Sequence, residues 1–185
     1  MFDDIYSKYK LFFNSDSKPD PEFLYDLVFG LRPRKYDTSD EEKLILDEED
    51  EVREMYLLEA GIVGIGFYLF TQGLSKKQYK LGTFMRGNSI ICDYYVCFNK
   101  KSEFIFMVVQ DVKAFSISQK FLKEEIFPKY PVQELYIKRG CHDRYKRAIR
   151  ARLLKYRNEH INEVNKKNTL VQVLTKYTGP PFAAD

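Results

Sequence analysis

The chain has 185 residues and a formal net charge of +3, and this length suits one domain with extensions. Hydrophobic residues make up 44% and charged residues 31%, enough for a core beneath a well-solvated surface, and the small net charge indicates no particular partner. The longest mostly apolar run, residues 60–70, is far shorter than the ~20 residues that span a bilayer, which argues against a membrane-spanning segment.

The three cysteines, Cys92, Cys97 and Cys141, are odd in number and form no CxxC pair. This usage predicts buried free thiols in a reducing compartment, with neither a disulfide framework nor a zinc site. The first residues hold no basic segment followed by an apolar stretch, so no secretory signal is recognised. We therefore expect a soluble chain located in the cytoplasm or at the cytoplasmic face of a membrane.

Two helices are expected at the N-terminus. Apolar residues recur at near-helical spacing over residues 1–13, and a polar break follows at 14–19. Asp20 can cap a second helix, because Pro21 suits the first helical position and Glu22 the positive end of the helix dipole. Pro33 is expected to end this second helix.

The middle of the chain is typical of a β-sheet protein. Its runs of alternating apolar residues predict two antiparallel sheets closing a roll, with turns at Asp50-Glu51 and Ala60-Gly61. The expected core includes Val63, Ile65, Phe67, Phe106, Val108 and Ile117. The candidate strands are 34–36, 44–47, 54–58, 62–70, 79–81, 104–109 and 113–117.

Two helices are expected after the strands. Ser118 can cap the first, which ends near Pro128 and Pro131, and the second runs from about Asp143 to Asn165. The apolar stripe of the long helix consists of Tyr145, Ile149, Leu153, Tyr156 and Val164. The expected divisions are N-terminal helices at 1–33, a β-roll at 34–117, C-terminal helices at 118–165 and a frayed tail at 166–185.

Charge is distributed unevenly, with an acidic segment at 37–54 and a basic one at 138–157. The run Asp47–Glu51 lacks the spacing and central glycine of a calcium loop, so we interpret it as a solvated hairpin tip. Three interpretations of the basic helix stay open: a solvated face, a lid with a basic residue able to reach the pocket, or a surface for acidic lipid headgroups, RNA or an acidic neighbour. An intramolecular or intersubunit pairing with 37–54 stays open as well.

The stretch from Lys43 to Phe70 resembles the opening strands of the cyclic-nucleotide-binding domain, and residues 23–36 resemble the join between linker helices and first strand in voltage-gated cation channels. The order helix, helix, strands, helix, long basic helix is similar to that of cyclic-nucleotide-gated and ether-à-go-go-like channels. This resemblance covers roughly residues 20–160. It implies a mainly β fold with flanking α elements, a β jelly roll (double-stranded β-helix) with N-terminal helices and a C-terminal helix pair.

The resemblance also implies where a nucleotide would bind. The family's cassette, Phe-Gly-Glu followed by small residues and Arg-Thr/Ser-Ala, corresponds to Ile91-Cys92-Asp93, then Tyr94, then Ser102-Glu103-Phe104, preceded by Gly87. The arginine that would bind the phosphate is absent, Cys92 replaces a glycine, and Phe104 is large enough to fill the pocket. Asp93 is either the acceptor for the ribose hydroxyl or a plain surface acid. Arg86, Lys100 and Lys101 are the basic residues that could substitute electrostatically.

We therefore expect a cytoplasmic regulatory domain of a potassium-type cation channel, with weak or no cAMP or cGMP binding and no cofactor or metal. The expected partners are channel subunits or segments, including a homotetramer, with no nucleic acid and with the membrane only indirectly. Two alternatives stay open: a free-standing scaffold or interaction module, and a true cAMP or cGMP sensor of channel or kinase-regulatory type. Cys141-His142 lacks a third orienting group, so catalysis is not expected.

Overall fold

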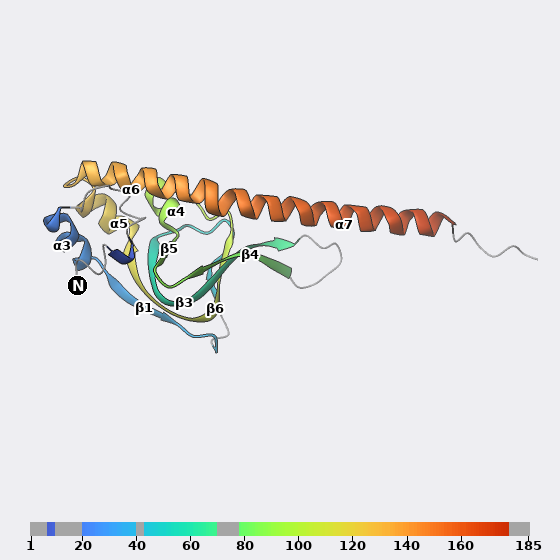
Figure 1. Ribbon diagram of the computed structural model, residues 1–185, viewed down its shortest axis with the longest axis horizontal. Coiled ribbons are helices and arrows are strands. Elements are labelled where there is room, and N and C mark those ends of the chain that lie inside the picture. The colour runs from blue at the N-terminus through green and yellow to red at the C-terminus, as the bar shows by residue number, and fades with distance from the viewer. Residues whose placement is uncertain (1–6, 10–19, 40–42, 70–77, 178–185) are drawn as a thin grey trace, which may run out of the picture.

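The computed structural model describes residues 7–9, 20–39, 43–69 and 78–177 of the chain. Strands form a roll, and helices cover one end and one side of it (Figure 1). The elements are α3 (Pro21–Phe29), β1 (Arg32–Tyr36), β2 (Leu44–Leu46), β3 (Glu54–Leu69), β4 (Gln78–Arg86), β5 (Ser89–Ile91), α4 (Asp93–Phe98), β6 (Ile105–Ser118), α5 (Gln119–Phe121), the π-helical segment η1 (Leu122–Ile126), α6 (Pro131–Arg144), the π-helical segment η2 (Tyr145–Arg150) and α7 (Ala151–Tyr177).

The strands of the described residues form one antiparallel sheet in the order β1-β6-β3-β4, with β2 paired to β6 and β5 paired to β3. The expected mainly β jelly roll with flanking helices is confirmed. All six expected core residues, Val63, Ile65, Phe67, Phe106, Val108 and Ile117, are buried. Their alternation along β3 and β6 directs them to the inner face of the roll.

The prediction of two separate sheets with a turn at Ala60-Gly61 is wrong. β3 continues through this point from Glu54 to Leu69, and β6 likewise joins two expected strands into one from Ile105 to Ser118. The two strands shift register repeatedly between Leu58 and Val63, which bends them without ending their pairing. Gly61 has a φ of +92°, and a β-carbon there would lie 2.1 Å from the Asp111 carbonyl oxygen, so the glycine permits a bulge instead of a turn.

Helix α3 starts as expected but ends earlier. The Asp20 carboxylate accepts a hydrogen bond from the Glu22 amide at 2.9 Å, which caps the helix. The helix ends at Phe29, and Pro33, expected to end it, lies inside β1. The ring of Phe121 packs against Gly30, the residue that follows the helix, and a β-carbon on residue 30 would lie 2.1 Å from that ring. The end of the helix is therefore also a place of close tertiary packing. The helix expected at 1–13 falls mostly outside the described residues.

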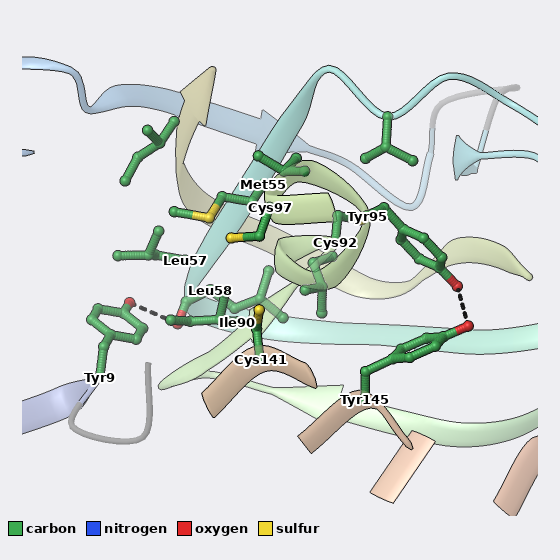
Figure 2. Close-up of a cluster of buried hydrophobic side chains, with 14 of the residues drawn as sticks. Tyr9, Met55, Leu57, Leu58, Ile90, Cys92, Tyr95, Cys97, Cys141 and Tyr145 are labelled. Atoms are coloured by element: carbon green, nitrogen blue, oxygen red, sulfur yellow. Dashed lines mark hydrogen bonds between the residues drawn. The ribbon is translucent and has the colours of Figure 1, made fainter. Parts of the chain in front are cut away.

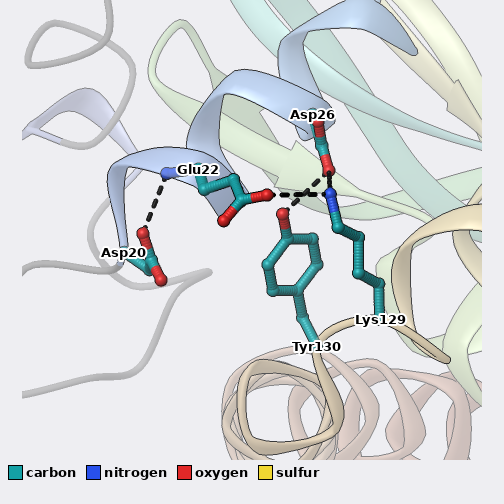
Figure 3. A network of polar contacts seen from close by, with 5 residues as sticks. All are labelled: Asp20, Glu22, Asp26, Lys129 and Tyr130. Atoms are coloured by element: carbon teal, nitrogen blue, oxygen red, sulfur yellow. Dashed lines mark hydrogen bonds and ion pairs between the residues drawn. The ribbon is translucent and has the colours of Figure 1, made fainter.

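A polar network joins α3 to the corner between η1 and α6 (Figure 3). Lys129 donates to Asp26 at 2.7 Å and to Glu22 at 3.1 Å, and the Tyr130 hydroxyl donates to Asp26 at 2.8 Å. Phe23 packs edge-on against the Tyr130 ring beside this network. The N-terminal helix is thereby attached to the base of the C-terminal helices.

The C-terminal helices are longer than expected. Ser118 caps α5 as predicted, accepting from the Phe121 amide at 3.2 Å. Pro131, expected to end a helix, starts α6 instead, where its missing N–H costs nothing. Helical backbone then continues through η2 and α7 to Tyr177, beyond the expected end at Asn165, and α7 projects past the roll (Figure 1). Within the described part of the chain, no helix is long and apolar enough to cross a membrane.

Candidate functional site

The expected nucleotide cassette contains a short helix. Strand β5 ends at Ile91, Cys92 adopts a left-handed conformation with φ of 66°, and α4 follows from Asp93 to Phe98. Asn99 is left-handed as well and ends this helix. The cassette therefore presents its acid at the first turn of α4, close to α6 of the C-terminal helices.

Asp93 is buried, so the interpretation as a surface acid is wrong. Its carboxylate forms an ion pair and hydrogen bond with the guanidinium of Arg144, the last residue of α6. Burial raises the pKa of the Asp93 carboxyl, and the positive charge of Arg144 offsets part of that rise. The acid that the resemblance assigns to a ribose hydroxyl is therefore bound to a residue of this chain's own long helix, the continuous helical stretch of α6, η2 and α7.

Aromatic rings continue the contact between α4 and η2. Tyr94 stacks on Tyr145 with ring centroids 4.0 Å apart and planes within 7° of parallel. The Tyr95 hydroxyl donates to the Tyr145 hydroxyl at 3.1 Å (Figure 2). These bulky tyrosines, which stand where the resemblance implies small residues, therefore hold the long helix against α4.

The segment where the phosphate arginine would stand folds onto itself. Ser102 is buried and its hydroxyl donates to the Phe104 carbonyl at 2.6 Å. Phe104 is fully buried in the core. Glu103 points outward and forms an ion pair with Arg150 of η2 at 2.8 Å. An anion at this position would meet a carboxylate and a hydroxyl that already has a partner.

Successive turns of the long helix pack against the roll. Ile149 and Leu153 are buried as predicted, and Leu153 fills the space beside Gly82 of β4. Tyr156 is 41% exposed, so its predicted place in the packed stripe is only partly correct. Arg157 lies over the ring of Phe67 and forms an ion pair with Glu48 at 3.6 Å. This ion pair joins the basic segment to the acidic one within the chain.

The basic residues suggested as substitutes for the phosphate arginine lie elsewhere. Lys100 and Lys101 follow the C-terminal end of α4, about 10 Å along the helix from Asp93 at 1.5 Å per residue, and line a separate surface cleft. Arg86 ends β4 with an exposed side chain, and Gly87 lies beside the Glu59 carbonyl in the turn to β5. The structure brings together Asp93 and Tyr94 but not these basic groups.

All three cysteines are buried free thiols, as predicted. The Cys97 thiol contacts that of Cys141, and this contact together with burial raises the pKa of Cys97 (Figure 2). Burial also raises the pKa of Cys92. The raised pKa values of Cys92 and Cys97 leave little thiolate at these two positions, and all three buried side chains pack in the core where α4 meets α6. Groups of side chains able to hold a metal ion are absent from the described residues.

Arg144 and Tyr145 are the site residues that sequence reasoning did not single out. The sequence did suggest that the basic helix could be a lid with a basic residue able to reach the pocket, and Arg144 is the basic residue that contacts Asp93. Several arginines in this helix are similar in sequence, and the structure places Arg144, at the end of α6, against α4. Exposed Lys146 and Arg147 match the alternative of a solvated face.

Models of known protein families and curated protein sequences give no match to the chain. Solved structures do match it. They include cAMP-bound PfPKA-R, with a TM-score of 0.53 and 14% identity, where the match covers 68% of this chain and 41% of that one. The regulatory domain of Toxoplasma gondii PKA with cAMP matches with a TM-score of 0.56 and 12% identity, covering 77% of this chain and 49% of that one. Another is the N-terminal domain of a transcriptional regulator from Streptomyces coelicolor, with a TM-score of 0.56 and 12% identity, where the match covers 77% of this chain and 93% of that one.

These structures show that the chain has the cyclic-nucleotide-binding jelly-roll fold. The match spans less than half the length of the two PKA chains but most of the bacterial domain. At identities of 14% and below, the likeness defines the fold and leaves the ligand and the partners of this chain to be inferred from its own residues.

Proposed function

We propose that this chain is a regulatory domain of the cyclic-nucleotide-binding fold whose pocket is filled by its own side chains. The observation that carries the proposal is the buried contact of Asp93 with Arg144, covered by the stack of Tyr94 on Tyr145. The domain accordingly binds cAMP and cGMP weakly or not at all, with no cofactor and no catalytic role.

Energetics support this proposal. A cyclic nucleotide's phosphate loses water on binding, and charged hydrogen bonds of about 1.5–3 kcal/mol each must offset that loss. Ser102 stands in the arginine's place, and Glu103 adds repulsion. The nucleotide would also have to separate Arg144 from a buried carboxylate, which leaves charge uncompensated.

Titration calorimetry of residues 1–185 with cAMP and with cGMP tests the proposal. We expect dissociation constants in the millimolar range or no measurable heat, equivalent to about 4 kcal/mol of binding free energy or less. Low-micromolar binding that disappears in Asp93→Ala would overturn it and favour a true sensor. The same titration on Glu159→Ala is the matched control, since that acid is exposed on α7 and forms no part of the covered contact.

If the pocket is filled, regulation acts on the position of the long helix relative to the roll. In the docked arrangement, contacts from α4 and the roll hold η2 in place. A partner that binds better to an undocked arrangement would shift the equilibrium between the two arrangements by its difference in affinity for them. This domain then acts through contacts with other segments and not through a diffusible nucleotide.

For the cellular context we propose the cytoplasmic face of a potassium-type cation channel, with channel subunits as partners. The support is the sequence resemblance of residues 23–36 and of the element order to channel domains. RNA sequencing of the transcript upstream of Met1 tests this context. Encoded membrane-spanning segments in the same reading frame are expected, and an in-frame stop codon there would instead favour the free-standing scaffold.

A further inference from the structure

A surface cleft of about 720 Å³ lies away from the Asp93 contact. Four segments line it: the start of β1, the residues that lead into β3, the turn after α4 and the junction of β6 with α5. Its basic lining residues are Arg32, Arg53, Lys100, Lys101 and Lys120. Nothing in the contact between α4 and the long helix uses this surface.

Both acids of the cleft are already neutralised. Glu51 forms an ion pair with Arg53 at 3.1 Å. Glu54 accepts two hydrogen bonds from one guanidinium nitrogen of Arg34, at 2.7 and 2.9 Å, and Arg34 is not among the lining residues. The cleft therefore keeps an excess of positive charge after its internal pairs are formed.

The remaining cations are held on fixed backbone but have few partners. Among the ion pairs between described residues, none involves Arg32, Lys100 or Lys101, while Lys120 lies 3.8 Å from exposed Glu124. The Lys100 amide donates to the Tyr95 carbonyl at 2.9 Å, and Lys101 pairs through its backbone with Glu51. The chain thus fixes where these side chains start while their charges face solvent.

We propose that this cleft is the docking site for an acidic peptide segment of a partner protein. Charge complementarity carries the choice of ligand, since an excess of basic side chains favours a negatively charged partner. Phosphate recognition favours arginine forks converging on one point, whereas these charges are mostly lysines spread over four segments. Such an array matches carboxylates distributed along a chain. The site is independent of the proposed nucleotide pocket.

The experiment measures fluorescence anisotropy of a fluorescein-labelled octaglutamate peptide titrated with residues 1–185. We expect saturable binding at about 50 mM salt that weakens strongly at about 500 mM. The double variant Lys100→Glu/Lys101→Glu should weaken binding by at least about tenfold. Its matched control is Lys146→Glu/Arg147→Glu, which changes the net charge equally on an exposed face outside the cleft, and should stay within about twofold of the wild type.

Thermal melts of both variants establish that they are folded before binding is compared. Equal loss of binding in the two variants would show a general charge effect and overturn the proposal. The same titrations with inositol hexakisphosphate separate the alternatives: binding of this compound that needs Lys100 and Lys101, without binding of the peptide, would make the cleft a small-polyphosphate site and also overturn it. Failure of this docking leaves the calorimetric test of the nucleotide pocket unaffected.

Discussion

At the scale of single residues, two acids of the same cassette have different environments. Asp93 is buried against Arg144, while Glu103 is about two-fifths exposed beside Arg150. Removing one member of a buried ion pair leaves a charge without compensation, whereas solvent screens an exposed pair. Both pairs join residues of the expected cassette to the continuous helical stretch of α6 and η2, so they form a natural comparison.

We expect Asp93→Ala to lower the free energy of unfolding by about 3–5 kcal/mol and Glu103→Ala by at most about 1 kcal/mol. Urea denaturation followed by circular dichroism measures both values. Equal losses would mean that the Asp93 carboxylate is not held against Arg144 in solution, and the account of the filled pocket would then fail.

Leu153 and Arg147 give a second comparison at this scale, on one continuous helical stretch. Leu153 is fully buried against β4 and Arg147 is exposed. Leu153→Ala should cost about 2–5 kcal/mol because it removes buried carbon and leaves a cavity, and Arg147→Ala a few tenths. Chemical melts decide this, and similar values for the two variants would show that the helix does not dock on the roll.

At the scale of elements, the attachment of α3 to the C-terminal helices depends on charge. Hydrogen bonds from Lys129 and Tyr130 hold the pKa of Asp26 below its usual range. A lowered pKa in the folded state contributes stability that is present above the unfolded pKa of about 3.9 and lost as the pH falls through the folded value.

Asp26→Asn should therefore melt at a lower temperature than the wild type near pH 7, and the difference should shrink as the pH falls below about 4. Scanning calorimetry between pH 3 and pH 7 measures it. Lys129→Met is the control, because without the cation the additional effect of Asp26→Asn should lose most of its pH dependence. A difference between wild type and Asp26→Asn that is constant over this range would contradict the role given to this carboxylate.

At the scale of the whole molecule, the long helix has a docked part and a projecting part. Tyr145, Ile149 and Leu153 are buried, whereas the described side chains after Arg157 are mostly exposed and α7 extends beyond the roll (Figure 1). Most of the stability of a helix in a protein comes from the packing of its apolar face, so the two parts should differ in local stability.

Hydrogen exchange measured by mass spectrometry should show slow amide exchange from Tyr145 to about Arg157 and faster exchange from Asn158 onward. The peptide covering β6 serves as the internal reference for the protected core. Uniform protection along the whole of α7 would show that a partner, such as a second copy of the chain, covers the projecting part in solution.

The sequence by itself determined the fold class, the core of the roll and the caps at Asp20 and Ser118. Alternating apolar residues and capping side chains act over a few neighbouring positions, so they can be recognised in the chain. It also suggested where an altered cassette would lie, because residue types such as Phe104 and Tyr94 are visible without a structure.

Only the tertiary structure decided which strands are continuous, where α3 ends and which basic residue meets Asp93. Gly61 is compatible with a turn or a bulge, and its pairing with β6 selects the bulge. Arg144 is one of several similar cations, and its contact with Asp93 arises where α4 packs against α6 and Tyr94 stacks on Tyr145. Such outcomes arise from contacts between residues far apart in the chain, and no local pattern encodes them.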